Sequence, residues 1–101
     1  MLARPELSQT SLDLLIAADL MNKRGIAKFS RLDPDGSVCL LGAIDLAIED
    51  WGRNQAAVKQ LAKYVPGTGE SPSWHIASYN NAAKRTLDEC VAKLREAAYG
   101  G

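Results

Sequence analysis

Apolar residues dominate the middle of the chain, from Val38 to Ile48. The run reads Val38-Cys-Leu-Leu-Gly-Ala-Ile-Asp-Leu-Ala-Ile48, with a Pro- and Gly-containing turn before it and Trp51-Gly52 after it. A helix that is apolar on most of its circumference must be buried. The pattern therefore predicts a central helix over about residues 38–50, which is too short to span a membrane.

The first and last predicted helices have clear local end signals. The first covers about residues 10–23 and is apolar on more than one side, and Gly25 is expected to end it. The last covers about residues 86–98. Thr86 and Glu89 have the spacing of a capping box, in which each side chain satisfies a free backbone N–H at the helix start.

A third helix is predicted over about residues 55–65, where apolar residues recur at i, i+3, i+4 and i+7 after Asn54 as N-cap. Residues 66–80 are expected to form a long irregular segment. The sequence thus predicts one all-α domain over residues 1–101, a compact bundle of four main helices. The wide apolar surface of the first helix leaves open that a second copy of the chain covers part of it.

Composition narrows the class of protein. The chain has 101 residues, of which 47% are hydrophobic, and its twelve basic residues balance its twelve acidic ones. This neutrality argues against general nucleic-acid binding and favours self-association, so we expect a homodimer. Two cysteines without a Cys-x-x-Cys pair and a single histidine predict no disulfide framework, no metal site and no cofactor.

The sequence also bears on localisation. Residues 1–6 contain an arginine but are not followed by the apolar run of a signal peptide. No stretch approaches the roughly 18 apolar residues that a membrane helix needs. We therefore expect a cytoplasmic protein with reduced thiols and no membrane partner.

Cys39, His75 and Asn80 are the residue types of a thiol hydrolase, and a cysteine in the first turn of a helix gains thiolate stability. However, Cys39 lies in the apolar run and is expected to face the core. We therefore predict no catalytic site and keep the thiol enzyme as the less favoured alternative.

A second alternative is a helix-turn-helix DNA-binding protein that uses residues 54–65. Val58 and Leu61 follow Gly52 at the spacing that locks such a pair of helices. The residues that would then meet DNA are Arg53, Asn54, Gln55, Lys59 and Lys63. Ile48 stands where the motif needs a small residue, so the pattern favours an ordinary helical hairpin.

Trp74, His75, Tyr79 and Asn80 form a cluster of aromatic and polar residues in the expected loop. Because Trp and Tyr dominate binding hot spots, we predict that these four residues contact a partner. The alternative is that the aromatic rings close the end of the core and the asparagine caps backbone groups.

Two motifs resemble a known family: Cys39-Leu-Leu-Gly-Ala-Ile44, and the turn Tyr79-Asn80-Asn81 before a threonine-capped final helix. Over residues 25–98 the chain is similar to small uncharacterised proteins of actinobacteria and their phages. That family usually has Trp-Asn-Asp in the turn, so this chain lacks one carboxylate and fits acid–base chemistry less well. The resemblance implies a phage accessory protein that binds a host component in the bacterial cytoplasm.

These observations together predict a small, non-enzymatic protein-interaction module. We expect residues 71–81 to contact the partner protein and the exposed edge of the first helix to mediate self-association. Nucleic acid is not an expected partner.

Overall fold

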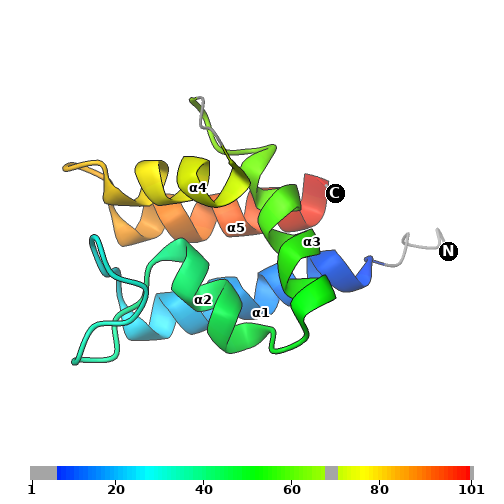
Figure 1. Cartoon of the computed structure of the whole chain (residues 1–101), viewed down its shortest axis with the longest axis horizontal. Coiled ribbons are helices and arrows are strands. Elements are labelled where there is room, and N and C mark those ends of the chain that lie inside the picture. The colour runs from blue at the N-terminus through cyan, green and yellow to red at the C-terminus, as the bar shows by residue number, and fades with distance from the viewer. Residues whose placement is uncertain (1–6, 68–70, 101) are drawn as a thin grey trace, which may run out of the picture.

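The computed structural model describes residues 7–67 and 71–100, and over these residues the protein is all-α (Figure 1). The helices in chain order are α1 (Gln9–Arg24), α2 (Leu40–Ala47), α3 (Trp51–Ala62), α4 (Pro72–Asn81) and α5 (Leu87–Gly100). The predicted class is confirmed. The predicted number of main helices was wrong, because α4 lies in the segment expected to be irregular. Among the described helices, none combines the length and the apolar character needed to cross a bilayer.

Helices α1 and α5 pack along each other and make the most extensive contact between any two of the described helices (Figure 1). Small side chains at Ala17 and Ala18 of α1 and at Ala97 and Ala98 of α5 are fully buried, which allows close packing. Gly25 ends α1 as predicted: it has a φ of 96°, and its N–H donates to the Met21 carbonyl at 2.9 Å.

Helix α2 is the buried centre of the fold and packs against α1, α3 and α4. Every residue from Leu40 to Ile44 is buried. The helix is shorter than the predicted 38–50, because Val38 pairs instead with the connector that follows α1. Its N–H donates to the Gly25 carbonyl at 3.0 Å, and its carbonyl accepts the Ala27 N–H at 2.9 Å. The end of the apolar run is extended at Ile48.

Helix α3 begins at Trp51, four residues before the predicted start. Its N-cap is Asp50, whose carboxylate accepts the Arg53 N–H at 2.9 Å. Asn54, the predicted cap, lies inside the helix and is buried. The carboxylate of Asp50 is available three residues ahead of Arg53, so the helix starts there.

Helices α4 and α5 both begin with side-chain caps. Ser71 caps α4 by accepting the Trp74 N–H at 3.1 Å, and Pro72 occupies the first turn. The predicted capping box of α5 is confirmed. The Thr86 N–H donates to the Glu89 carboxylate at 2.9 Å, and the Glu89 N–H donates to the Thr86 hydroxyl at 3.2 Å.

Candidate functional site

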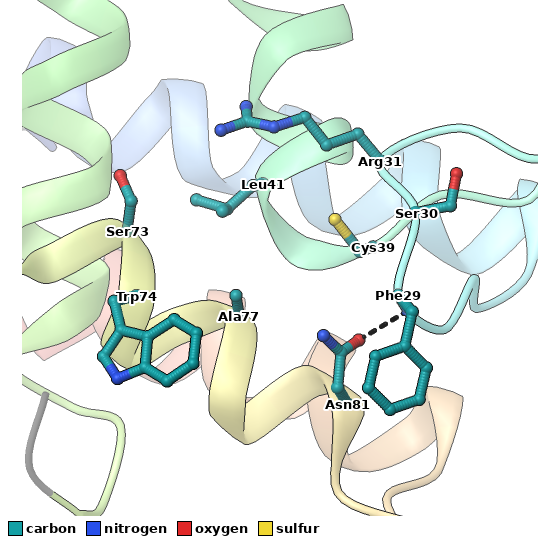
Figure 2. Close-up of a pocket in the computed structure, with 9 residues that line it drawn as sticks. All are labelled: Phe29, Ser30, Arg31, Cys39, Leu41, Ser73, Trp74, Ala77 and Asn81. Atoms are coloured by element: carbon teal, nitrogen blue, oxygen red, sulfur yellow. Dashed lines mark hydrogen bonds between the residues drawn. The ribbon is translucent and has the colours of Figure 1, made fainter.

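An open groove of about 450 Å³ lies between α4 and the connector from α1 to α2 (Figure 2). The connector supplies Phe29 and Arg31, and Cys39 and Leu41 come from the start of α2. The side chains of α4 that line it are Ser73, Trp74, Ala77 and Asn81. We call this feature the Phe29–Trp74 groove. A smaller hollow lined by Phe29, Trp74, Ala77 and Asn81 adjoins it.

Phe29 has an unusual backbone conformation. Its φ of 61° is the only positive φ of a non-glycine residue in the described parts of the chain. Its side chain is 82% exposed, so packing of the ring offers no compensation. A left-handed conformation costs a bulky residue about 1–2 kcal/mol. The fold therefore maintains a strained residue whose ring faces solvent.

Two contacts from the end of α4 hold Phe29 in place. Its N–H donates to the Asn81 side-chain oxygen at 2.8 Å, the dashed line of Figure 2. The neighbouring Lys28 ammonium donates to three backbone carbonyls, one in the last turn of α4 and two in the turn between α4 and α5. These belong to Asn80 at 2.6 Å, Ala82 at 2.9 Å and Arg85 at 2.9 Å. Lys28 and the Phe29 N–H thus fasten the connector to the end of α4 and to the turn that follows it.

Trp74 forms the other wall of the groove and is 59% exposed. Ala77 and Asn81 follow it at i+3 and i+7, so the three residues share one face of α4. Figure 2 shows Asn81 beside Phe29 of the connector, with Ala77 and then Trp74 farther along the helix. The small side chain of Ala77 leaves the space between the two aromatic walls open.

The connector passes very close to the start of α2. A Cβ built on Gly42 would lie 2.8 Å from the carbonyl carbon of Arg31. The Arg31 carbonyl also accepts the Cys39 N–H at 3.3 Å. The guanidinium of Arg31 forms an ion pair with Asp45 of α2. These contacts fix the part of the groove that is opposite α4.

The four residues predicted to contact a partner occupy different environments. Of them, Trp74 alone lines the groove. His75 is partly exposed, and its Nε2 lies 2.5 Å from the Val65 carbonyl oxygen. Tyr79 is 7% exposed, with the Arg85 guanidinium 3.6 Å above its ring, and burial raises the pKa of its hydroxyl.

Asn80 is 1% exposed and connects three segments. Its side-chain oxygen accepts the Leu40 N–H at 3.0 Å, and its amide donates to the Ala27 carbonyl at 2.9 Å. Buried Tyr79 and Asn80 thus match the alternative interpretation, in which they close and cap the core. The sequence interpretation missed Phe29 and Arg31, and no sequence signal marks Phe29 because left-handed positions are usually taken by Gly or Asn.

Cys39 and His75, two of the three residues of the thiol-hydrolase alternative, contact different parts of the fold. The Cys39 sulfur accepts the Gly42 N–H at 3.3 Å as N-cap of α2 and is 6% exposed. His75 does not line the groove beside this sulfur. Burial raises the pKa of the other thiol, Cys90, to about 11. Within the described residues, no three His, Cys, Asp or Glu side chains gather as metal ligands would.

The residues of the helix-turn-helix alternative also have internal partners. Arg53 makes two hydrogen bonds to Asp13, at 2.6 and 3.1 Å. Asn54 is buried, and its amide donates to Asp45 at 3.0 Å and to the Ile48 carbonyl at 3.3 Å. Lys59 and Lys63 are exposed, and Val58 and Leu61 are buried as the motif requires. The start of α3 is therefore occupied by contacts within the fold.

Comparison with known protein families gives a match over most of the chain. A family described as "Family of unknown function (DUF6197)" matches residues 7–99. No curated protein and no solved structure matches the chain. The resemblance seen in the sequence is thus supported at the level of an uncharacterised family, and the match carries no information on source. Because it covers nearly the whole chain, the protein belongs to the family of unknown function DUF6197.

Proposed function

We propose that this protein is a small, non-enzymatic interaction module that binds a protein partner in the Phe29–Trp74 groove. The observation that carries the proposal is Phe29, a strained residue whose exposed ring forms one wall of the groove. Backbone strain that the surrounding contacts maintain is concentrated at functional sites. A ring held in this way is ready to contact a partner.

The composition of the groove supports the same function. Trp74 offers a large apolar surface on a rigid helix, and Phe29 faces the same groove from the connector. Aromatic anchors of this kind provide much of the binding energy at protein interfaces. Since both side chains are already positioned, binding requires little ordering of the groove.

The two alternatives have weaker support. A DNA-binding role would use Arg53 and Asn54, which already have partners inside the fold. A thiol enzyme would need a base near Cys39, whereas His75 contacts the Val65 carbonyl. Partner binding in the Phe29–Trp74 groove leaves these contacts of Arg53, Asn54 and His75 intact. A host-cell protein remains the expected partner class, on the strength of the resemblance to phage and actinobacterial proteins.

The test is affinity capture from actinobacterial lysate with the wild-type protein and three variants. Trp74→Ala and Phe29→Gly each remove one wall of the groove, and Trp51→Ala removes an aromatic side chain that is 75% exposed on α3. We expect one defined protein to be captured by the wild type and by Trp51→Ala, and to be lost with both groove variants. Thermal unfolding should show that all four proteins are folded.

Capture that is equal for the wild type and both groove variants would overturn the proposal. Loss of capture together with loss of folding in Trp74→Ala would instead show that Trp74 acts in the core. In that case Phe29→Gly decides, because its ring contributes little buried area.

A further inference from the structure

We infer that the Phe29–Trp74 groove binds an extended, proline-rich segment in the polyproline II conformation. The inference rests on the proposed function, because it names the chemistry of the partner at the same site. It follows from a hydrogen-bond donor in the groove, from its two aromatic side chains, and from the charge of the lining.

The donor is the side-chain amide of Asn81. Its oxygen accepts the Phe29 N–H at 2.8 Å and the Asn80 side-chain amide at 3.2 Å. Because both donors contact the oxygen, the orientation of the carboxamide is fixed, and Nδ2 faces the groove toward Ala77 (Figure 2). No acceptor for Nδ2 is present among the residues that the structure describes.

This donor discriminates between an extended and a helical partner. A helix uses its own N–H groups to pair most of its backbone carbonyls, so a docked helix would present few free carbonyls to the Asn81 amide. A polyproline II segment has no internal hydrogen bonds and offers its carbonyls to the groove. A partner that covers the groove must satisfy this amide or lose affinity.

The walls suit a proline ring. Phe29 and Trp74 lie at opposite ends of the groove, with the side chains of Ala77 and Asn81 between them (Figure 2). Proline-rich segments dock in aromatic-lined grooves of this kind, and they are already extended, so little conformational entropy is lost on binding.

The charge of the lining favours a neutral segment. Arg31 is the one charged residue that lines the groove, and Asp45 neutralises it in an ion pair. An acidic partner would compete with Asp45 for this guanidinium, and a basic partner would find no carboxylate in the lining. An uncharged, proline-rich segment neither competes with Asp45 nor needs a carboxylate in the lining.

The test is an NMR titration of the ¹⁵N-labelled full chain with a blocked proline oligomer of about ten residues, long enough for several turns of the helix. A blocked amphipathic helical peptide of equal length is the matched control. We expect saturable shifts of the Trp74 indole and Asn81 amide signals with the proline oligomer only. Trp74→Ala should abolish this binding.

Asn81→Asp is the sharpest variant, because it keeps an oxygen for the Phe29 N–H and removes the donor. It should weaken binding of the proline oligomer about tenfold, as expected for one lost hydrogen bond. Full affinity in Asn81→Asp, or shifts with the helical peptide alone, would overturn the inference. So would no shift with either peptide. Each of these results leaves the proposed function intact if partner capture still depends on Trp74 and Phe29.

Discussion

The side-chain oxygen of Asn80 accepts the backbone N–H of Leu40, so a residue at the end of α4 satisfies a free donor at the start of α2. The same side chain donates to the Ala27 carbonyl in the connector. One buried carboxamide thus joins three segments that are far apart in sequence. The Asn80 amide also donates to the Asn81 side-chain oxygen at 3.2 Å, the same oxygen that accepts the Phe29 N–H, so the joint is connected to the groove.

Replacement of Asn80 by alanine should destabilise the fold. The Leu40 N–H and the Ala27 carbonyl would lose their partner while still buried, and each unsatisfied group costs about 1–3 kcal/mol. We expect the free energy of unfolding to fall by roughly 2–4 kcal/mol in urea denaturation. Ser78→Ala, an exposed change on the same helix, should have almost no effect. Equal stability of the two variants would contradict the role of Asn80.

Gly42 is required by the close approach of the Arg31 carbonyl, which was not foreseen. The connector backbone at Arg31 occupies the space that a side chain at position 42 would need. Gly42→Ala should therefore cost about 1–3 kcal/mol, as overpacking does. Gly52→Ala is the control, since its Cβ would lie 3.4 Å from the Asp50 carboxylate in an exposed turn of α3.

The Gly52→Ala control should not lower the free energy of unfolding. Alanine is favoured over glycine in a helix by up to about 1 kcal/mol, so Gly52→Ala should be neutral or stabilising. Both variants can be measured by urea denaturation at neutral pH. Equal stability of Gly42→Ala and Gly52→Ala would contradict the close approach of the connector backbone to Gly42.

Asp13 should make the stability depend on pH. Its side chain is 1% exposed, and hydrogen bonds from Arg53 hold its pKa below the ordinary value despite burial. A carboxyl with a lowered pKa stabilises the fold above its unfolded pKa, about 3.9, and loses that contribution as pH falls through the folded value. Asp13→Asn should therefore be less stable than wild type at pH 7.

The difference between Asp13→Asn and wild type should shrink as the pH falls below about 4. Denaturant unfolding at a series of pH values measures it. Arg53→Met removes the same hydrogen bonds but keeps the buried carboxyl, whose pKa burial then raises, so this variant should also lose the stabilisation at pH 7. Parallel pH profiles for wild type and both variants would show that the Asp13–Arg53 pair does not stabilise the fold.

Local signals predicted the parts of the fold that depend on neighbouring residues. The capping box of α5 involves Thr86 and Glu89, three residues apart, and the stop of α1 involves Gly25 and the preceding turn. Burial of residues 40–44 also followed from their composition alone. Interactions within one turn of helix are encoded where they act, so the sequence is sufficient to find them.

Helix α4 was missed because it contains few apolar residues at helical spacing. Ile76 and Tyr79 are its buried apolar residues, and the third buried position is the polar Asn80. Ser71 and Pro72 were a usable start signal, an N-cap serine before a first-turn proline. The burial of Asn80 itself depends on Leu40 and Ala27, which no local pattern can indicate.

The two cysteines should differ in reactivity. Cys90 is fully buried with a pKa of about 11, so iodoacetamide at pH 8 should modify it only as the protein unfolds. Cys39 borders the groove, but it is only 6% exposed, which limits access of the reagent to the sulfur. We expect it to react faster than Cys90 and at least about tenfold slower than free cysteine.

Mass spectrometry of the alkylated peptides separates the two rates. The single-thiol variants Cys39→Ser and Cys90→Ala assign each rate to one residue, and serine retains the capability to cap α2. If Cys39 in the folded protein reacts as fast as free cysteine or faster, the thiol enzyme becomes the better functional hypothesis.

Self-association should depend on the exposed edge of α1. Leu12 and Ile16 are 45% and 52% exposed and lie one helical turn apart, and the chain has no net charge to keep copies apart. Ile16→Glu should convert a dimer into a monomer in sedimentation equilibrium. Its unfolding free energy at low protein concentration should change by less than about 0.5 kcal/mol, as for other surface substitutions. Trp51→Glu, a change of an exposed aromatic residue outside α1, should remain dimeric. A wild-type protein that is monomeric at high concentration would contradict the predicted homodimer.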